Sequence, residues 1–301
     1  MKQSNTTSHQ IRSLLYAAIC VLFWALIPVC SKRALTGVNS YLFLSISSLI
    51  SAVTMLIYLV SRKRLTALKR LSAKDIVRIS FLGLLGSFVY YLFLYKAFAL
   101  SSAQEVFVIN YLWPVLVVLF ASVILGERLK GSSILSILIS FCGVVLIATR
   151  GNPLALKLAN ITGDVLAFFA AVSFALFSVL GKGSKYDNDI SVFIYFAVSF
   201  LFSLLLLPAF TLKHLTPDVI FWLLVNGIFA NGISYIFWFE ALKGTQTAIV
   251  SNMVYLTPFV ALLFIRLFLG ETIHTYSLEA LMLIVIGILM QGFLTKRSQA
   301  I

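Results

Sequence analysis

The sequence predicts an all-α membrane protein with ten transmembrane helices, arranged as two inverted five-helix repeats. The first reason is composition: of 301 residues, 61% are hydrophobic and 11% are charged, whereas a soluble domain carries about 25% charged residues. The second is a series of apolar runs, each near the roughly 20 residues that cross a bilayer. The third is a similarity between the halves of the chain. We expect one transmembrane domain, 1–301, with repeat one over about 13–149 and repeat two over about 162–294.

Apolar runs account for most of the chain, and their continuity favours helices over membrane β-strands, which alternate in polarity. Helix-start residues precede two of them. Ser72 and Asp75 have capping-box spacing before the third run, and Thr216 precedes Pro217 and Asp218 at the eighth. The first run lacks a small-residue cleavage site and is expected to be retained. The predicted spans are 13–35, 41–60, 76–99, 103–125, 131–149, 162–183, 190–210, 218–242, 247–268 and 276–294.

The net charge of +13 comes from loops between the apolar runs, most densely from the segment 61–78. Lysine and arginine favour cytoplasmic loops that face anionic lipid. This distribution predicts that both termini lie in the cytoplasm. The expected location is a bacterial inner membrane. It also argues against a nucleic-acid partner.

Nothing in the sequence points to an enzyme or to a cofactor. Cys20, Cys30 and Cys142 lie in apolar runs without metal-site spacing. The sequence contains no His-Glu-x-x-His, no Gly loop ending in Gly-Lys-Ser/Thr, and no Gly-x-Ser-x-Gly. The histidines are His9, His214 and His274, all outside the predicted spans.

An internal repeat is the most informative feature of the chain. At an offset of 144 residues, Tyr91 aligns with Tyr235, Pro114 with Pro258, Gly126-Glu127 with Gly270-Glu271, and Gly143 with Gly287. Each half then holds five spans, and an odd number inverts the second half relative to the first. Inverted repeats are a transporter architecture, with a substrate path near the bilayer midplane. The alternative is an old duplication in a protein that transports nothing.

These residues resemble a known family. Three sets of residues carry the resemblance: Tyr16 through Trp24 to Lys32 and Arg33; Gly163-Asp164 through Ser173 to Gly181-Lys182; and Pro114 and Pro258 with the Gly-Glu pair after each. Together they are similar to EamA-type proteins of the drug/metabolite transporter superfamily over nearly the whole chain. The resemblance implies ten helices, inverted repeats and export of metabolites.

A narrower resemblance covers one segment. Glu105-Val106 and Asn110-Tyr111-Leu112-Trp113-Pro114 are similar to YddG-type exporters of aromatic and other neutral amino acids. Gly126-Glu127-Arg128, by contrast, has the general form of the wider family. The segment therefore suggests amino acids as substrates and leaves the exact compound open.

Aromatic and amide side chains inside the spans are the candidate substrate-binding residues. Trp24 and Trp113 lie about ten residues into their spans, about 15 Å deep, where an indole N–H needs a partner. They either line a cavity or pack in the core. Buried amides either bind substrate or bond a neighbouring helix. The candidates are Trp24, Tyr91, Tyr95, Asn110, Tyr111, Trp113, Asn231, Tyr235, Asn252 and Tyr255. Trp222 and Trp238 lie near span ends and are expected in the membrane interface.

Three prolines and four charges complete the candidates. Pro28, Pro114 and Pro258 interrupt spans and serve either as hinges or as static kinks. Lys96 and Arg266 lie near span ends, from which they can reach the interface. Glu240 is a further charged residue near the end of a predicted span. Glu105 is a possible coupling residue, taking up and releasing a proton, or else an acid that complements a helix dipole.

The sequence therefore predicts a secondary transporter that exports amino acids or similar neutral metabolites by alternating access. No midplane cluster of lysine or arginine is present to bind phosphorylated substrates. The alternatives are a broad-specificity drug or metabolite exporter and a non-transporting scaffold or receptor. Expected partners are a small-molecule substrate and the lipid bilayer, with a monomer or homodimer as the assembly.

Overall fold

The computed structural model of the protein describes residues 2–126, 135, 138–143, 146, 151–152, 160–181, 184–244 and 256–297. These residues form helices with short connections, plus one isolated bridge between Val38 and Leu212. Within the described ranges, seven helices are long and apolar enough to cross a membrane, and two shorter apolar helices cover Thr257–Leu269 and Thr275–Gly287. The predicted all-α class is confirmed. Most of the predicted span 131–149 and the start of the span 247–268 lie outside the described residues.

The chain divides into two compact units, and each unit takes segments from both halves of the sequence. Unit 1 consists of Met1–Phe88 and Ser184–Gly270, and unit 2 consists of Val89–Gly183 and Glu271–Ile301. The expected single domain, with its two repeats, stays a prediction.

Unit 1 contains the larger number of helical segments, and several of them start directly after a capping residue. Asn39 accepts a hydrogen bond from the Leu42 N–H, and the predicted capping box between Ser72 and Asp75 is present. Its elements are α1 (Lys2–Ala25), α2 (Ile27–Ala34), α3 (Ser40–Ser61), η1 (Leu65–Arg70), α4 (Ala73–Gly83), η2 (Leu84–Val89), α10 (Asn188–Ser203), η3 (Leu204–Ala209), α11 (Pro217–Leu224), η4 (Val225–Ile233), α12 (Ser234–Gly244), α14 (Thr257–Phe264) and η5 (Ile265–Leu269).

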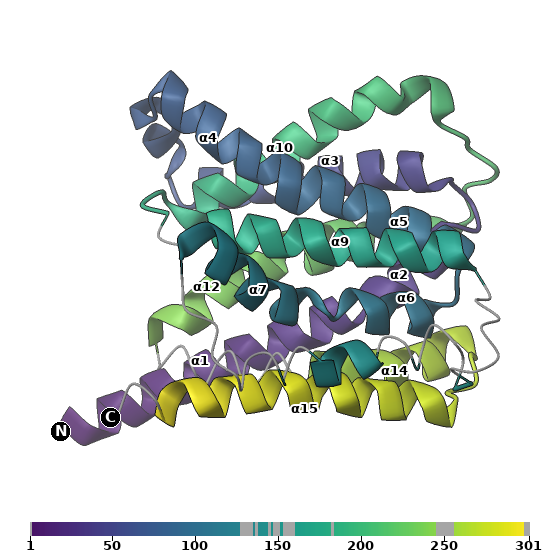
Figure 1. The fold of residues 1–301 in the computed structure, drawn as a ribbon. Helices are drawn as coiled ribbons and strands as arrows, with labels where there is room; N and C mark the ends of the chain where they lie inside the picture. The colour runs from purple at the N-terminus through teal and green to yellow at the C-terminus, as the bar shows by residue number, and fades with distance from the viewer. Residues whose placement is uncertain are drawn as a thin grey trace. The chain divides into compact units, whose positions relative to one another are not determined.

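Unit 2 is built around one central helix. Its elements are α5 (Tyr90–Leu100), α6 (Ala103–Asn110), α7 (Trp113–Leu125), α9 (Ile161–Leu180) and α15 (Thr275–Arg297). Helix α9 packs against α5, α6 and α7, and α15 packs against α6 and α7 (Figure 1). The α9 surface carries alanines Ala167, Ala170, Ala171 and Ala175, all fully buried, which lets neighbouring helices approach closely.

Repeat-related segments adopt the same local structure. Helix α7 has 13 residues and ends at Gly126, where φ is 68°; α14 with η5 covers the equivalent residues and ends at Gly270, where φ is 69°. Helices α5 and α12 each have 11 residues, begin at equivalent positions, and each follows a π-helical segment, η2 or η4. This agreement supports the internal repeat read from the sequence.

Substituting either of these two glycines should have the same small effect. Among the residues that the structure describes, a Cβ at Gly126 or at Gly270 would meet nothing within 4 Å, so only the left-handed backbone is known to oppose a side chain. We expect Gly126→Ala and Gly270→Ala each to destabilise the protein by about 1–2 kcal/mol, and Gly→Asn by less. Thermal unfolding in detergent tests this; a large difference between the two alanine variants would contradict the equivalence.

A polar seam joins α3 to η4 in unit 1. The Ser51 hydroxyl donates to the Gly227 carbonyl at 2.9 Å, and Asn226 Nδ2 donates to Ser47 Oγ at 3.1 Å. A Cβ on Gly227 would lie 2.6 Å from the Ile50 Cβ. The two segments are therefore in backbone contact, which only glycine permits.

An ion cluster fixes the end of α3 to the start of α10. Arg64 donates to the carboxylates of both Asp187 and Asp189. Asp187 also caps α10, and Asp189 is buried. Close by in sequence, the Tyr186 hydroxyl donates to Asp75 Oδ1 at 2.9 Å, and this hydrogen bond raises the pKa of Tyr186.

Candidate functional site

The candidate residues of unit 1 form an aromatic cluster around Trp24. Trp24 Nε1 donates to Ser234 Oγ at 3.0 Å, so the predicted partner for this indole exists. The Trp24 ring lies 6.3 Å from Tyr235, edge to face, and 5.3 Å from Trp238. Tyr235 in turn lies 5.8 Å from Phe196. Trp24 is half-buried, so part of its surface stays open for further contacts.

Asn231 lies in η4, one turn before Tyr235, and is 1% exposed. The expected interfacial positions of Trp222 and Trp238 stay predictions. Trp222 is buried against Val29 and Cys30, and its Nε1 donates to Asp218 Oδ1 at 3.0 Å. The carboxylate one turn earlier satisfies the indole N–H inside the unit, so contact with the lipid interface is not needed.

The candidate residues of unit 2 form a second cluster around Asn110. Asn110 Nδ2 donates to the Tyr90 hydroxyl at 3.2 Å. The Tyr90 ring contacts Tyr91 at 4.7 Å and Phe174 at 5.0 Å, and Tyr91 stacks on Tyr95 at 5.0 Å. All three tyrosines are buried.

Trp113 and Tyr111 extend this cluster across the break between α6 and α7. The Trp113 ring lies edge to face with Phe174 at 5.1 Å and with Tyr111 at 6.5 Å. Trp113 is half-buried, as Trp24 is, whereas Tyr111 is 3% exposed. Each unit therefore has one half-buried indole, and the one in unit 2 lies beside buried tyrosines.

Asn110 carries an unsatisfied acceptor. Its side chain is 5% exposed, and its Oδ1 accepts no hydrogen bond from any residue that the structure describes. A buried polar atom of this kind costs about 1–3 kcal/mol and is rare in proteins. Asn110 is also the last residue of α6, directly before the break. This acceptor, with no donor among the described residues, makes Asn110 the strongest candidate of the unit 2 cluster for contact with a bound molecule.

The three prolines lie at the starts of helical segments. Pro28, Pro114 and Pro258 each occupy the second position of a helix, α2, α7 or α14. The missing N–H has no intrahelical partner there, so proline is tolerated. The helix is interrupted at Leu26 before α2 and at 111–112 between α6 and α7, so α6 and α7 form a discontinuous helix. The roles of the prolines as hinges or static kinks stay predictions.

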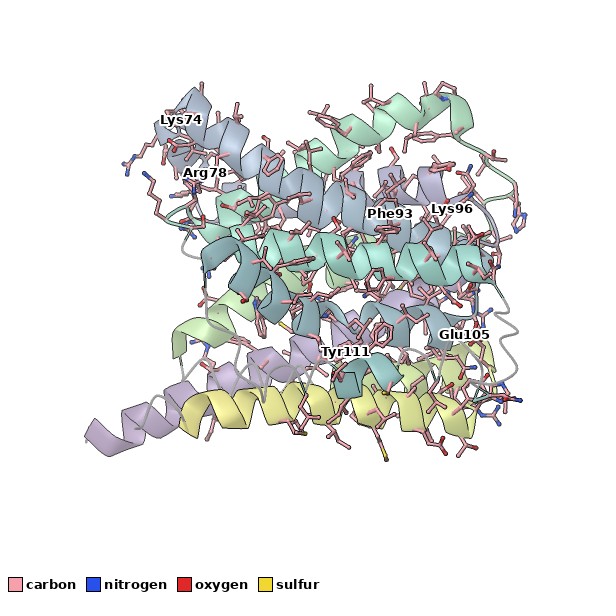
Figure 2. All side chains as sticks on the ribbon, in the orientation of Figure 1. Lys74, Arg78, Phe93, Lys96, Glu105 and Tyr111 are labelled. Atoms are coloured by element: carbon pink, nitrogen blue, oxygen red, sulfur yellow. The ribbon has the colours of Figure 1, made fainter. Side chains whose placement is uncertain are left out.

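Glu105 and its neighbours form the N-terminal end of α6. The Glu105 N–H donates to Ser102 Oγ at 3.3 Å, so its carboxylate lies in the first turn. Lys96 lies at the same end of unit 2 (Figure 2). Glu271 Oε1, from the second Gly-Glu pair, accepts from the Ala103 N–H at 3.1 Å. The Gly-Glu glutamate therefore caps a neighbouring helix, which the sequence alone did not indicate.

Tyr90, Ser234 and Phe174 are contact residues that the sequence analysis missed. Tyr90 and Ser234 are equivalent in the internal repeat, and each hydroxyl accepts an N–H from a candidate residue of its own unit. The alignment of the two halves at an offset of 144 residues pairs Tyr90 with Ser234 and could have identified them. Asn252 and Tyr255 lie outside the described residues, and those described hold no group of three metal-ligating side chains.

Comparisons with known proteins agree with this architecture. The sequence model of the EamA-like transporter family matches residues 11–149 and again 161–292. The chain is 27% identical over 283 residues to an uncharacterized transporter of Archaeoglobus fulgidus, which spans 90% of this chain and 95% of that protein. It is 25% identical over 294 residues to the uncharacterized transporter YvbV of Bacillus subtilis, covering 96% and 94%.

Two further comparisons are narrower. Over 101 residues, a third of each chain, it is 32% identical to the aromatic amino acid exporter YddG of Ancylobacter novellus. A solved crystal structure has the same fold, with a TM-score of 0.69 at 20% identity over 95% of this chain and 98% of the other.

Proposed function

Because this chain belongs to the EamA-like transporter family and is a multi-pass membrane transporter, we propose that it exports amino acids with large apolar or aromatic side chains. Transport proceeds by alternating access between two inverted five-helix repeats. The candidate residues of each aromatic cluster are the substrate-binding residues that we propose for that unit. The local similarity to an aromatic amino acid exporter supports this substrate class.

The observation that carries the proposal is the unsatisfied Asn110 oxygen at the break between α6 and α7. An ammonium group is a strong donor for this acceptor. The N-terminal end of α7 carries partial positive charge, and such half-helix ends bind substrate carboxylates in other transporters. Trp113 and Tyr111 supply apolar surface beside the C-terminal end of α6 and the N-terminal end of α7. A zwitterion with a large side chain matches this set of groups.

Counterflow into proteoliposomes tests the substrate class. Labelled L-phenylalanine should exchange faster than a sugar phosphate or a dicationic dye. Asn110→Leu should lower phenylalanine exchange at least tenfold, whereas Tyr90→Phe, which removes the same Asn110–Tyr90 hydrogen bond, should lower it less. Equal losses in the two variants would make Asn110 a structural residue, and exchange of sugar phosphate alone would refute the substrate class.

A broad-specificity metabolite exporter is the second candidate, because aromatic surfaces accept many apolar shapes. Faster exchange of the dye than of phenylalanine would favour it.

We place the protein in a bacterial inner membrane with both termini in the cytoplasm, as a monomer or homodimer. Reporter fusions at Ile301 and after Gly37 should report cytoplasm and exterior respectively. Glu105 fits the role of a first-turn acid on α6.

A further inference from the structure

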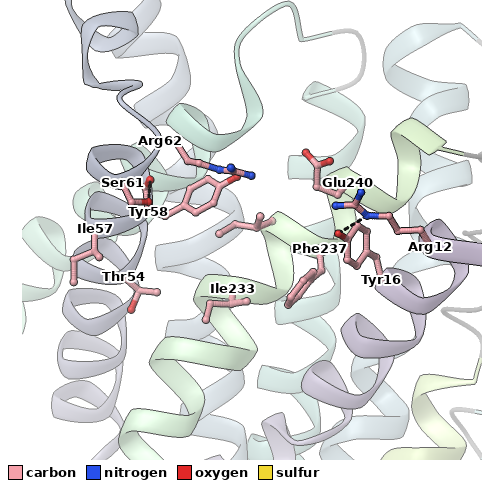
Figure 3. A pocket seen from close by; sticks show the side chains of 11 residues that line it. Arg12, Tyr16, Thr54, Ile57, Tyr58, Ser61, Arg62, Ile233, Phe237 and Glu240 are labelled. Carbon is pink, nitrogen blue, oxygen red and sulfur yellow. Dashed lines mark hydrogen bonds between the residues drawn. The ribbon is translucent and has the colours of Figure 1, made fainter. Parts of the chain in front are cut away.

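An open pocket of about 460 Å³ lies within unit 1 and is lined by none of the residues of the Trp24 cluster. It is lined by the start of the apolar part of α1, the last turns of α3, and α12 with the end of η4 (Figure 3). Its polar residues are Arg12, Tyr16, Thr54, Tyr58, Ser61, Arg62 and Glu240. The volume is in the range of small-molecule sites.

Each of the two arginines contacts a tyrosine four residues away in the sequence. Arg12 Nε donates to the Tyr16 hydroxyl at 2.7 Å, and its guanidinium lies 5.3 Å from that ring. The Arg62 guanidinium lies 5.8 Å from the Tyr58 ring. Interaction with Tyr58, and more weakly with Glu240, raises the pKa of Arg62. A guanidinium has five N–H donors, so a single tyrosine oxygen leaves donors available to a ligand.

Glu240 contributes the opposite charge from α12. Figure 3 shows its carboxylate beside the Arg12 guanidinium, with Arg62 across the pocket. The remaining wall is largely apolar, formed by Ile57, Ile233, Ile236 and Phe237. The pocket thus combines two carboxylate-binding cations, one ammonium-binding anion and an apolar surface.

We propose that this pocket binds a free amino acid, with its carboxylate on Arg62 and Arg12, its ammonium on Glu240 and an apolar side chain on Phe237. Arginine forks match carboxylates in bidentate geometry. A purely anionic ligand, such as a lipid phosphate, would instead be repelled by Glu240. The inference rests on the proposed function, because it adds a second site for the same substrate class. In the expected topology the pocket opens to the cytoplasm, where an exporter takes up its cargo.

Protection of a cysteine placed in the pocket tests the inference directly. Ser61 lines the pocket and is exposed, so Ser61→Cys in a Cys142→Ser chain is labelled with a maleimide in nanodiscs of neutral lipid. L-phenylalanine should slow labelling. Phenethylamine lacks the carboxylate and 3-phenylpropanoate lacks the ammonium, so each should protect at least tenfold less well.

Variants then assign the two charges. Arg62→Gln should raise the phenylalanine concentration for half-protection at least tenfold and remove the preference over phenethylamine. Glu240→Gln should remove the preference over 3-phenylpropanoate. Arg70→Gln and Glu279→Gln, exposed residues outside the pocket, should match the parent.

Three outcomes would overturn the inference: no protection by phenylalanine, equal effects of Arg62→Gln and Arg70→Gln, or protection only when anionic lipid is added. Counterflow of phenylalanine by the same protein reports separately on the proposed function. A Ser61→Cys protein that exchanges phenylalanine while its introduced thiol stays unprotected would retain that function and lose this site.

Discussion

Replacing Gly227 with leucine should leave little folded protein. The added side chain has no space, because even a Cβ would lie 2.6 Å from the Cβ and Cγ2 of Ile50 and 3.2 Å from the Ser47 carbonyl oxygen. Neither neighbour can rotate away, since one is the branch point of a stiff side chain and the other is helix backbone. Separating η4 from α3 would also break the Ser51 hydrogen bond to the Gly227 carbonyl.

Overpacking a close-fitting core typically costs about 1–3 kcal/mol, which we expect for Gly227→Ala. Leucine should exceed that range and remove the monodisperse peak in size-exclusion chromatography. Phe229→Leu is the matched control, because Phe229 lies in the same π-helical segment and is 37% exposed. A Gly227→Leu protein as stable and monodisperse as this control would show that η4 and α3 are not in backbone contact.

Replacing Arg64 with glutamine should be the most damaging charge substitution in unit 1. It would leave two carboxylates together at the start of α10 without their cation, one of them on the buried Asp189. Removing one partner of a buried pair costs roughly 3–5 kcal/mol. Since the Arg64 side chain is 38% exposed, we expect about 2–3 kcal/mol, below that range.

Thermal unfolding in detergent measures this loss, with Arg70→Gln on the same basic segment as the control. Adding Asp187→Asn and Asp189→Asn to Arg64→Gln should recover part of the stability, because the repelling carboxylates are then neutral. If the triple variant unfolds at a lower temperature than Arg64→Gln alone, the carboxylates are stabilised by groups other than Arg64.

The membrane spans could be predicted from sequence because the bilayer sets their length and polarity. Thus 41–60 was expected and Ser40–Ser61 is observed, and 103–125 was expected and Ala103–Leu125 is observed. The prolines were located correctly at the interruptions of their helices. Whether they act as hinges or as static kinks stays a prediction, because a proline in an apolar run looks the same in either role.

The contacts of the candidate residues were less accessible to sequence reasoning. Trp24 and Asn110 could be identified as buried polar groups that need partners, yet Ser234 and Tyr90 are single hydroxyls in apolar helices. Only tertiary packing brings them within hydrogen-bond distance. Arg12 and Arg62 lie just outside the predicted spans 13–35 and 41–60. Their convergence with Glu240 could not be predicted, because it depends on how three distant segments pack.

The π-helical segments η2 and η4 determine which way the following residues face. A π-turn holds one residue more than an α-turn, so every side chain beyond it is rotated by about 100° relative to an uninterrupted α-helix. The first residues beyond the two segments are Tyr90 and Ser234, the hydroxyls that accept hydrogen bonds from Asn110 and Trp24. Deleting one residue from either segment would turn its hydroxyl away from the cluster while keeping the helix intact. Because both segments end directly before equivalent positions, the same rotation sets the direction of the Tyr90 and Ser234 side chains.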